Sequence, residues 1–211
     1  MPDLSNRMHD VTEWVTGLFP QGGYFLEAGA HDGIGDSQTK QLEDLGGWRG
    51  ICVEPSSAFA GLKKYREGDK CKVDNRCLYN TDGGEVLFRQ VSGNSIELSG
   101  IQDSFQDDHW DRVTRPHKDL IKTTVTLPTL LKEYKAPPLI EFFSLDTEGS
   151  EYLILSCHDF SRWRFVAIQV EHNGVASHRK NLTDLLTRFD YELKSSDGVN
   201  DRWLWKGFVN P

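Results

Sequence analysis

Short apolar segments alternate with helical patterns along this chain, and that alternation limits its fold more than any other feature. Residues 24–26 are apolar and residues 51–54 are apolar up to the final Glu54; both runs are too short for buried helices and are bounded by glycine or a turn. A helical pattern follows each of them, the first ending at the stop signal Gly46-Gly47 and the second carrying Phe59 and Leu62 on one face. Strands that alternate with helices indicate an α/β domain with a mostly parallel sheet between two layers of helices.

The second half of the chain continues this pattern and ends on two strands. Apolar strands are predicted at 139–145 and 165–170, and leucines at helical spacing follow between 182 and 189. Segments 191–193 and 202–209 are predicted to close the chain as an antiparallel pair. The remaining predicted elements are an N-terminal helix within residues 1–20, strands at 72–78, 85–91 and 123–127, and a helix at 129–134.

Size and charge restrict the class of protein. The 211 residues suffice for one well-buried domain, so residues 1–211 are treated as one unit. A net charge of -8 argues against non-specific binding to nucleic acid, which depends on basic side chains. No apolar run approaches the roughly 20 residues that cross a bilayer, and no signal-peptide core follows the first residues. We therefore expect a cytoplasmic protein without a membrane partner; its oligomeric state is not indicated.

Residues 92–119 form a long polar segment with weak helix and strand signals. Long irregular segments inside compact domains are often lids or binding loops, so this one is a candidate lid near an acceptor site. A surface insertion without a role in binding is the alternative.

Polar clusters follow the predicted strands at their carboxyl ends. They are residues 27–33, Glu54, Asn75, residues 146–151 and residues 171–173. Open α/β sheets bind their ligands at this edge, which predicts one binding site built from these clusters.

The first cluster favours a cationic ligand. Its pattern Glu27-x-Gly29-x-x-x-Gly33 differs from the GxGxxG of dinucleotide sites, and its acid would repel a pyrophosphate. The glycines would let the backbone approach a ligand closely, and Glu27 would face its positive charge. Glu54, after the next strand, could accept both hydroxyl protons of a ribose. The alternative is a tight turn that binds nothing.

Four residues after the later strands are candidates for catalysis: Asp146, Glu148, Glu171 and His172. His172 is the best candidate for a general base, since its reference pKa is near 6.5. No metal ligand is assigned, although the same four residues could instead hold a divalent ion. Glu148 also fits a helix-stabilising role in a first turn.

Four segments together resemble the FkbM family of methyltransferases. They are Glu27-Ala-Gly-Ala-His-Asp-Gly33, Ser37-Gln-Thr-Lys-Gln-Leu-Glu43, Gly47-Trp-Arg-Gly-Ile-Cys-Val-Glu-Pro55 and Ser144-Leu-Asp-Thr-Glu-Gly-Ser-Glu151. The similarity extends over residues 22–206. It implies a Rossmann-like methyltransferase fold, with a doubly wound seven-stranded sheet of order 3-2-1-4-5-7-6 and an antiparallel last strand. In this implied order the strands that precede Asp146 and His172 are neighbours, so these two residues should lie close together. It also implies S-adenosylmethionine as the methyl donor.

The resemblance also implies donor-binding positions. Glu54 corresponds to the acid that binds the ribose, and Asn75 and Arg76 match an adenine contact more loosely. Family members often carry Asn where this chain has His31. The predicted donor-binding residues are Glu27, Ala28, Gly29, Ala30, His31, Gly33, Glu54, Pro55, Asn75, Arg76 and Asp146.

The predicted function is an S-adenosylmethionine-dependent methyltransferase that acts on a hydroxyl of a small-molecule or carbohydrate-like acceptor. One alternative is a nicotinamide-dependent reductase, which would share the sheet but requires the missing GxGxxG. The other is a donor-binding module without turnover.

Overall fold

A computed structural model of the chain describes residues 4–105 and 114–209, with side chains from Val11 onward. Its main sheet has seven strands in the order β10-β11-β9-β8-β1-β2-β3. They are β1 (Gly23–Ala28), β2 (Trp48–Val53), β3 (Cys71–Asp74), β8 (Leu139–Leu145), β9 (Arg164–Glu171), β10 (Tyr191–Ser196) and β11 (Asn200–Trp205). Numbered along the chain, these seven strands have the order 3-2-1-4-5-7-6. The last strand, β11, is antiparallel to both neighbours, so the predicted fold class is confirmed.

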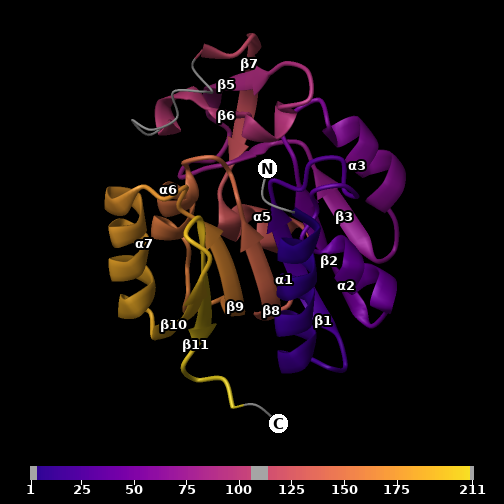
Figure 1. Cartoon of the computed structure of the whole chain (residues 1–211), viewed down its shortest axis with the longest axis vertical. Coiled ribbons are helices and arrows are strands. Elements are labelled where there is room, and N and C mark those ends of the chain that lie inside the picture. The colour runs from indigo at the N-terminus through magenta and orange to yellow at the C-terminus, as the bar shows by residue number, and fades with distance from the viewer. Residues whose placement is uncertain (1–3, 106–113, 210–211) are drawn as a thin grey trace.

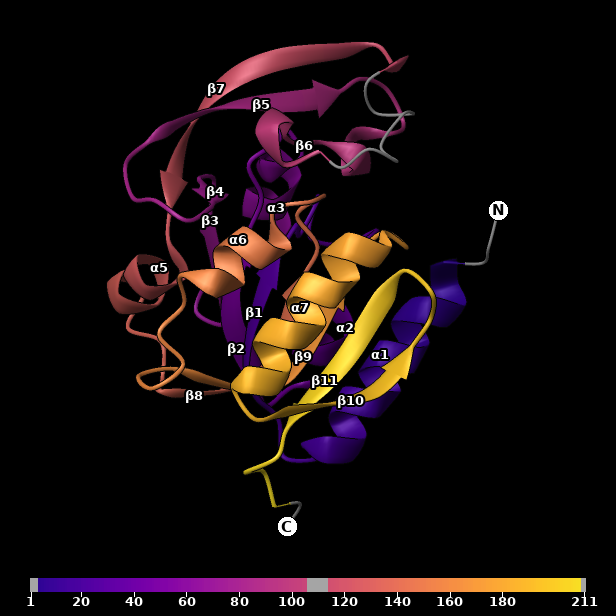
Figure 2. The ribbon, with the colours of Figure 1, turned by 90° about the vertical axis from the view of Figure 1, so that its left-hand side faces the viewer.

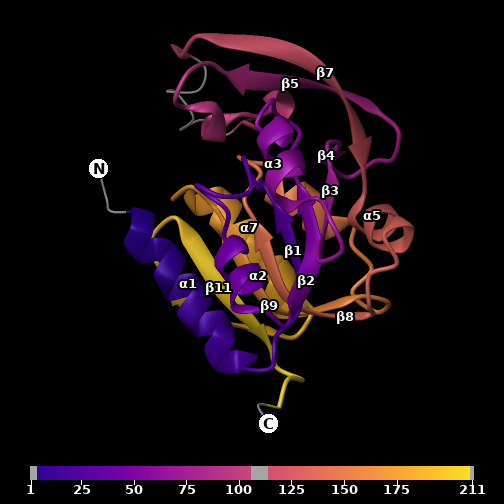
Figure 3. The same ribbon diagram turned by 90° about the vertical axis from the view of Figure 1, so that its right-hand side faces the viewer.

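Helices cover both faces of this sheet (Figures 1, 2 and 3). One layer contains α1 (Leu4–Leu18), α2 (Lys40–Leu45) and α3 (Phe59–Arg66), and the other contains α5 (Leu127–Glu133), α6 (Glu151–Ser156) and α7 (Ala176–Arg188). Each layer has its own apolar core: Phe25 packs with the first, and its neighbour Leu26 packs with the second. Because both faces are buried, the central strands are nearly continuous apolar runs, which is why they could be predicted. No helix in residues 4–105 or 114–209 is long and apolar enough to span a bilayer.

A second sheet lies beyond the carboxyl ends of the parallel strands (Figures 1 and 2). Its order is β4-β7-β5-β6, formed by β4 (Cys77–Leu78), β5 (Glu85–Val91), β6 (Gly100–Ile101) and β7 (His117–Val125). The predicted strand 72–78 is therefore two strands in different sheets, and the strand predicted at 123–127 is the end of the longer β7.

Residues 92–119 were predicted to be irregular, and the part of this segment that the structure describes contains only short elements. Its role as a lid stays a prediction. The 3-10 turns Ile96–Leu98 and Gln102–Ser104, strand β6 and the start of β7 lie there, while residues 106–113 fall outside the described residues. Strand β7 is exposed along most of its length, so its sequence is polar and resembles a loop.

The hydrogen bonds that attach the second sheet to the main domain include, among the described residues, one to β5 and one from β7. The Ser57 N–H donates to Gln90 Oε1 of β5 at 2.8 Å, and Lys122 Nζ of β7 donates to Asn75 Oδ1 at 3.3 Å. These contacts place the second sheet over the strand ends.

Candidate functional site

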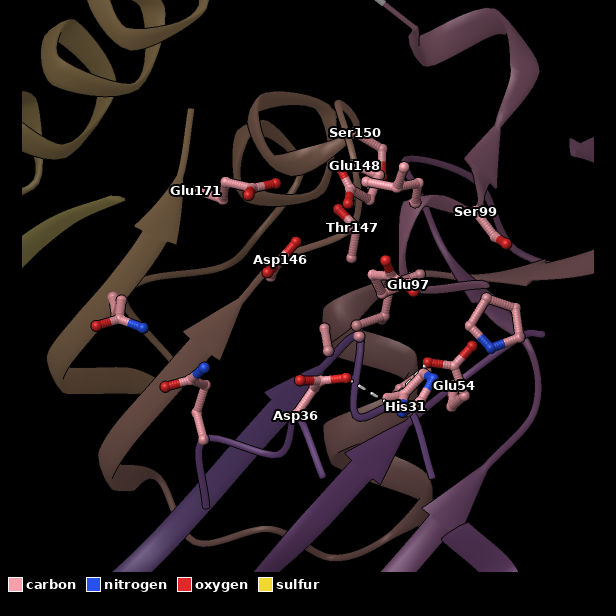
Figure 4. Close-up of a pocket in the computed structure, with 18 of the residues that line it drawn as sticks. His31, Asp36, Glu54, Glu97, Ser99, Asp146, Thr147, Glu148, Ser150 and Glu171 are labelled. Carbon is pink, nitrogen blue, oxygen red and sulfur yellow. Dashed lines mark hydrogen bonds and ion pairs between the residues drawn. The ribbon is translucent and has the colours of Figure 1, made fainter. Parts of the chain in front are cut away.

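A cavity of about 260 Å³ lies between the strand ends of the main sheet and the second sheet. This volume is close to the lower end of the range for small-molecule sites. Its floor is formed by the residues that end β1, β2, β8 and β9, and its roof by Phe88, residues 96–99 and Ile101. Figure 4 shows Asp146, Thr147, Glu148 and Glu171 grouped on one side, His31, Asp36 and Glu54 on another, and Glu97 between the two groups.

The turn after β1 is in contact with the turn after β8. The Gly29 N–H donates to the Val53 carbonyl at 3.0 Å, and Gly29 has φ +86°. A Cβ at Gly29 would lie 1.9 Å from the Asp146 carbonyl oxygen, so only glycine allows this approach. His31 has φ +50°, a region in which Asn and His are enriched. The Asn that family members often carry at this position is therefore explained by backbone conformation.

Glu27 does not line the cavity, which corrects its predicted role as a direct donor contact. Its side chain is 1% exposed and turns toward α3. Oε2 accepts hydrogen bonds from Ser37 Oγ at 2.7 Å and Thr39 Oγ1 at 2.6 Å, and Oε1 accepts one from the Gln38 N–H. Glu27 therefore shapes the loop that brings Asp36 and Gln38 to the cavity.

Glu54 lines the cavity and joins the first two loops. Oε2 accepts a hydrogen bond from the His31 N–H at 2.9 Å, and Oε1 accepts one from the Ser56 N–H at 2.7 Å. Burial raises the pKa of Glu54, against the lowering effect of these donors. Each carboxylate oxygen has a further lone pair that can accept a ligand hydroxyl.

An apolar slot adjoins Glu54, but Asn75 and Arg76 do not line it, contrary to prediction. Asn75 Nδ2 donates to the Glu54 carbonyl at 2.8 Å. Arg76 pairs instead with Asp74 of β3 and with Glu133 of α5, at 2.6 Å each. The slot is formed instead by Val53, Pro55, Cys77, Leu78 and Phe88.

Three carboxylates meet at the opposite side of the cavity. Asp146, Glu148 and Glu171 each offer an oxygen, and these atoms lie within 4.8 Å of one another. Asn173 Nδ2 donates to Glu171 Oε2 at 2.8 Å and to Glu148 Oε2 at 3.3 Å. Such a group can take a proton from a bound hydroxyl or, as oxygen ligands, hold a divalent cation.

His172 lies on the other side of β9, so its predicted pairing with Asp146 was wrong. Glu171 and Gln169 line the cavity, and alternation along the strand turns His172 away from it. His172 Nδ1 accepts the Gly174 N–H at 3.1 Å, and Nε2 lies 3.4 Å from Asp201 Oδ1. Burial lowers the pKa of His172, although the charge of Asp201 opposes this.

The structure thus brings together only part of the predicted site. The predicted residues that line the cavity are Ala28, Gly29, His31, Glu54, Pro55, Asp146, Glu148 and Glu171. Those that do not are Glu27, Ala30, Gly33, Asn75, Arg76 and His172. Ala30 is buried in the core beside α1, and a Cβ at Gly33 would meet Arg66 and Leu62 of α3, which explains these two positions.

Sequence reasoning missed several residues of the cavity. They include Asp36, Gln38, Glu97, Ser99, Gln169, Asp197, Asn200 and Arg202. Thr147, Ser150 and Asn173 lie inside the predicted clusters but were not singled out, although Asn173 donates to two of the carboxylates. Gln38 could have been found, because it lies in the second segment of the family resemblance. Glu97 and Ser99 carried no signal, since their place depends on the second sheet.

The cavity is strongly acidic. Its described lining includes seven carboxylates, Asp36, Glu54, Glu97, Asp146, Glu148, Glu171 and Asp197, against the basic side chains His31 and Arg202. Arg202 Nε donates to Gln169 Oε1 at 3.1 Å. A cleft lined mainly by one sign of charge attracts cations and repels phosphates.

Comparisons with known proteins agree with this architecture. A solved FkbM methyltransferase from Methylobacillus flagellatus KT superposes with a TM-score of 0.53 at 13% identity, covering 88% of this chain and 44% of that one. The METTL16 MTase domain gives a TM-score of 0.50 at 13% identity, covering 99% of this chain and 70% of that one. At such identities these matches show the fold alone. No curated protein sequence matches the chain significantly.

The family model described as the methyltransferase FkbM domain matches residues 27–193, which is most of the chain. The chain spans less than half the length of the FkbM structure that it matches. The match covers both the first-strand loop and the turn that holds Asp146 and Glu148. This chain therefore belongs to the FkbM family of methyltransferases.

Proposed function

We propose that the protein is an S-adenosylmethionine-dependent methyltransferase of the cytoplasm that methylates a hydroxyl group of a small-molecule or carbohydrate-like acceptor. The observation that carries this proposal is the single cavity in which the loops after β1 and β2 face the carboxylates after β8 and β9. The side formed by the loops after β1 and β2 is suited to a nucleoside with a positive charge. The side formed by the carboxylates after β8 and β9 is suited to removing a proton from a bound hydroxyl.

The residues present fit the donor. Gln38 Oε1 is buried and accepts no hydrogen bond from the described residues, so it can accept one from the donor's ammonium group. Asp36 adds negative charge beside it. Glu54 can accept the ribose hydroxyls, and the apolar slot that begins at Val53 and Pro55 can take the adenine. When bound, this donor would supply a methyl group on a sulfonium, which is electrophilic.

The chain's own residues would position the acceptor and take its proton. The carboxylates of Asp146, Glu148 and Glu171 surround one point at which a hydroxyl could donate a hydrogen bond. A carboxylate that accepts this proton would make the acceptor's oxygen a better nucleophile. The oxygen would then take the methyl group, and the electron pair of the broken carbon–sulfur bond would stay on sulfur. Glu97 and Ser99 enter from the roof and could hold other polar groups of the acceptor. Aligning the two reactants is the other main contribution of the protein.

The same cavity disfavours the reductase alternative. A dinucleotide brings a pyrophosphate, and among the described lining residues only His31 and Arg202 could carry a compensating positive charge. Seven carboxylates would repel it.

Calorimetry with S-adenosylhomocysteine, S-adenosylmethionine and NADPH tests the proposal. We expect the first two to bind and NADPH not to bind. Hydroxyl compounds can then be screened for S-adenosylhomocysteine release. Binding of NADPH alone would favour the reductase; binding of the donor without turnover on any acceptor would favour the donor-binding module.

We predict that Glu54→Ala weakens the binding of S-adenosylhomocysteine by at least about tenfold, since hydrogen bonds to a charged acceptor contribute about 1.5–3 kcal/mol each. Wild-type affinity should also fall as the pH decreases, because protonation removes the charge that strengthens these bonds. Burial raises the pKa of Glu54 above its ordinary value of 4.5, so this loss should begin at a higher pH than for an exposed glutamate.

Calorimetry from pH 7 to pH 5 measures both effects. Glu54→Gln should show a flatter pH profile than the wild type. Glu67→Ala, which removes an exposed glutamate after α3, is the matched control and should bind normally. A folded Glu54→Ala variant that loses less than threefold in affinity would contradict the assignment.

A further inference from the structure

The turn between β8 and α6 is closed by Glu151, a residue that does not line the cavity. Glu151 Oε1 accepts hydrogen bonds from the Thr147 N–H at 2.7 Å and Thr147 Oγ1 at 3.0 Å. The Gly149 N–H donates to both carboxylate oxygens, at 3.1 and 3.0 Å. One buried side chain therefore fixes the residues on both sides of Glu148.

This turn has a backbone that needs such support. Glu148 has φ +64° and Gly149 has φ +114°, so two consecutive residues lie in the left-handed region. A glutamate rarely adopts this conformation unless its surroundings impose it. In this conformation the Glu148 carboxylate lies with those of Asp146 and Glu171.

His178 of α7 supplies the remaining partner of Glu151. Its Nε2 lies 2.9 Å from Glu151 Oε2, and the two side chains are 5% and 1% exposed. Burial alone would raise the pKa of Glu151, but the hydrogen bond and charge of His178, together with backbone N–H donors, lower it. Glu151 is therefore an ionised acceptor with donors from both the turn and α7.

The turn after β9 also contacts the cavity carboxylates. Asn173 donates to Glu148 and Glu171, and His178 follows five residues later on α7. The three cavity carboxylates thus lie between two turns. The turn after β8 is bonded to α7 through Glu151 and His178, and the turn after β9 leads directly into α7.

We propose that Glu151 and His178 form a positioning pair that fixes the turn 147–150 and so holds Glu148 against Asp146 and Glu171 in the cavity. This inference depends on the proposed function in one respect: the carboxylates that the pair positions are those that would serve methyl transfer. Neither residue is expected to touch donor or acceptor.

Three variants of the whole chain test the pair. His178→Phe keeps a ring of similar shape but removes the donor to Glu151, and His178→Gln can restore an N–H donor. His158→Phe is the matched control, because His158 is also a buried histidine, 6% exposed, whose Nε2 bonds to the Trp163 carbonyl outside this turn. Hydrogen exchange of single amides and calorimetry with S-adenosylhomocysteine are the two measurements.

In His178→Phe we expect exchange at the Thr147 and Gly149 amides to accelerate by at least about tenfold relative to the amides of β8, because their acceptor becomes mobile. Affinity for S-adenosylhomocysteine should fall at least threefold, since the turn follows Asp146, whose backbone is in contact with Gly29 in the donor loop. His178→Gln should restore both, and His158→Phe should lower the melting temperature without changing either.

Equal effects of His178→Phe and His158→Phe on these amides would overturn the proposal, as would no effect of His178→Phe. If His178→Phe does not fold, Glu151→Gln is tested in its place, because this variant keeps one acceptor oxygen and loses the charge. Unchanged amide exchange and unchanged affinity in Glu151→Gln would then contradict the proposed positioning role. If the wild type does not bind S-adenosylhomocysteine, the proposed function fails, while the exchange measurement still decides the role of the pair.

Discussion

Replacing Gly29 by alanine should destabilise the fold by at least about 2 kcal/mol and remove measurable binding of S-adenosylhomocysteine. A residue with a side chain in the left-handed region costs about 1–3 kcal/mol, and forcing atoms into a packed site costs a similar amount. At Gly29 both apply, because φ is +86° and the new Cβ would lie 1.9 Å from the Asp146 carbonyl oxygen. The turns after β1 and β8 would have to separate, and both line the cavity.

Gly35→Ala is the matched control for this prediction. Gly35 lies in the same loop, but a Cβ there would meet only Asp32 Oδ1, at 3.8 Å. Urea denaturation and calorimetry should find this variant close to the wild type in stability and affinity. A Gly29→Ala protein with unchanged stability and affinity would show that the two turns are not in contact.

The main sheet could be predicted because its strands are buried on both faces. Segments such as Leu139–Leu145 and Arg164–Glu171 are then mainly apolar and stand out from the helices between them. The strand order came from the family resemblance, since periodicity does not reveal which strands are neighbours. The second sheet had no comparable signal, because β7 has buried residues only near its end.

The cavity lies at the sheet edge where a binding site was predicted, whereas the predicted direction of several side chains was wrong. Neighbouring residues at a strand end point to opposite faces, so a shift of one position exchanges a cavity residue for a core residue. Ala28 lines the cavity and Glu27 does not; Glu171 lines it and His172 does not. The polar cluster at each strand end was visible in the sequence, but the face on which each side chain lies was not.

The role of Glu27 depended on partners that are distant in sequence. Ser37 and Thr39 are about ten residues away, and Arg66 reaches the same carboxylate from α3. An acid before a glycine-rich turn gives no sign that a cation on another helix will face it. The interpretation as a ligand contact was therefore natural from the sequence, and only the packing of α3 on β1 corrects it.

That packing leads to the second large effect: Arg66→Met should destabilise the protein by about 3–5 kcal/mol, the usual result of removing one partner of a buried ion pair. The Arg66 side chain is fully buried; Nε donates to Glu43 Oε2 at 2.9 Å, and Nη1 lies 4.0 Å from Glu27 Oε2. It also donates to Ser37 Oγ at 2.8 Å, Thr39 Oγ1 at 3.1 Å and the Gly33 carbonyl at 3.1 Å. Methionine fills most of the space but supplies none of these donors, so Glu27 and Glu43 lose their positive partner.

Urea denaturation measures this effect, with Lys180→Met as the control. Lys180 pairs with Asp184 on the exposed side of α7, and such pairs contribute only about 0.3–0.5 kcal/mol. Adding Glu27→Gln to Arg66→Met should recover part of the lost stability, because the double variant no longer buries an unpaired charge. If Arg66→Met stays within about 1 kcal/mol of the wild type, the hydroxyls of Ser37 and Thr39 alone are sufficient to hold Glu27. Otherwise, the loop that carries Asp36 and Gln38 to the cavity depends on a cation supplied by α3, and affinity for S-adenosylhomocysteine should fall together with stability.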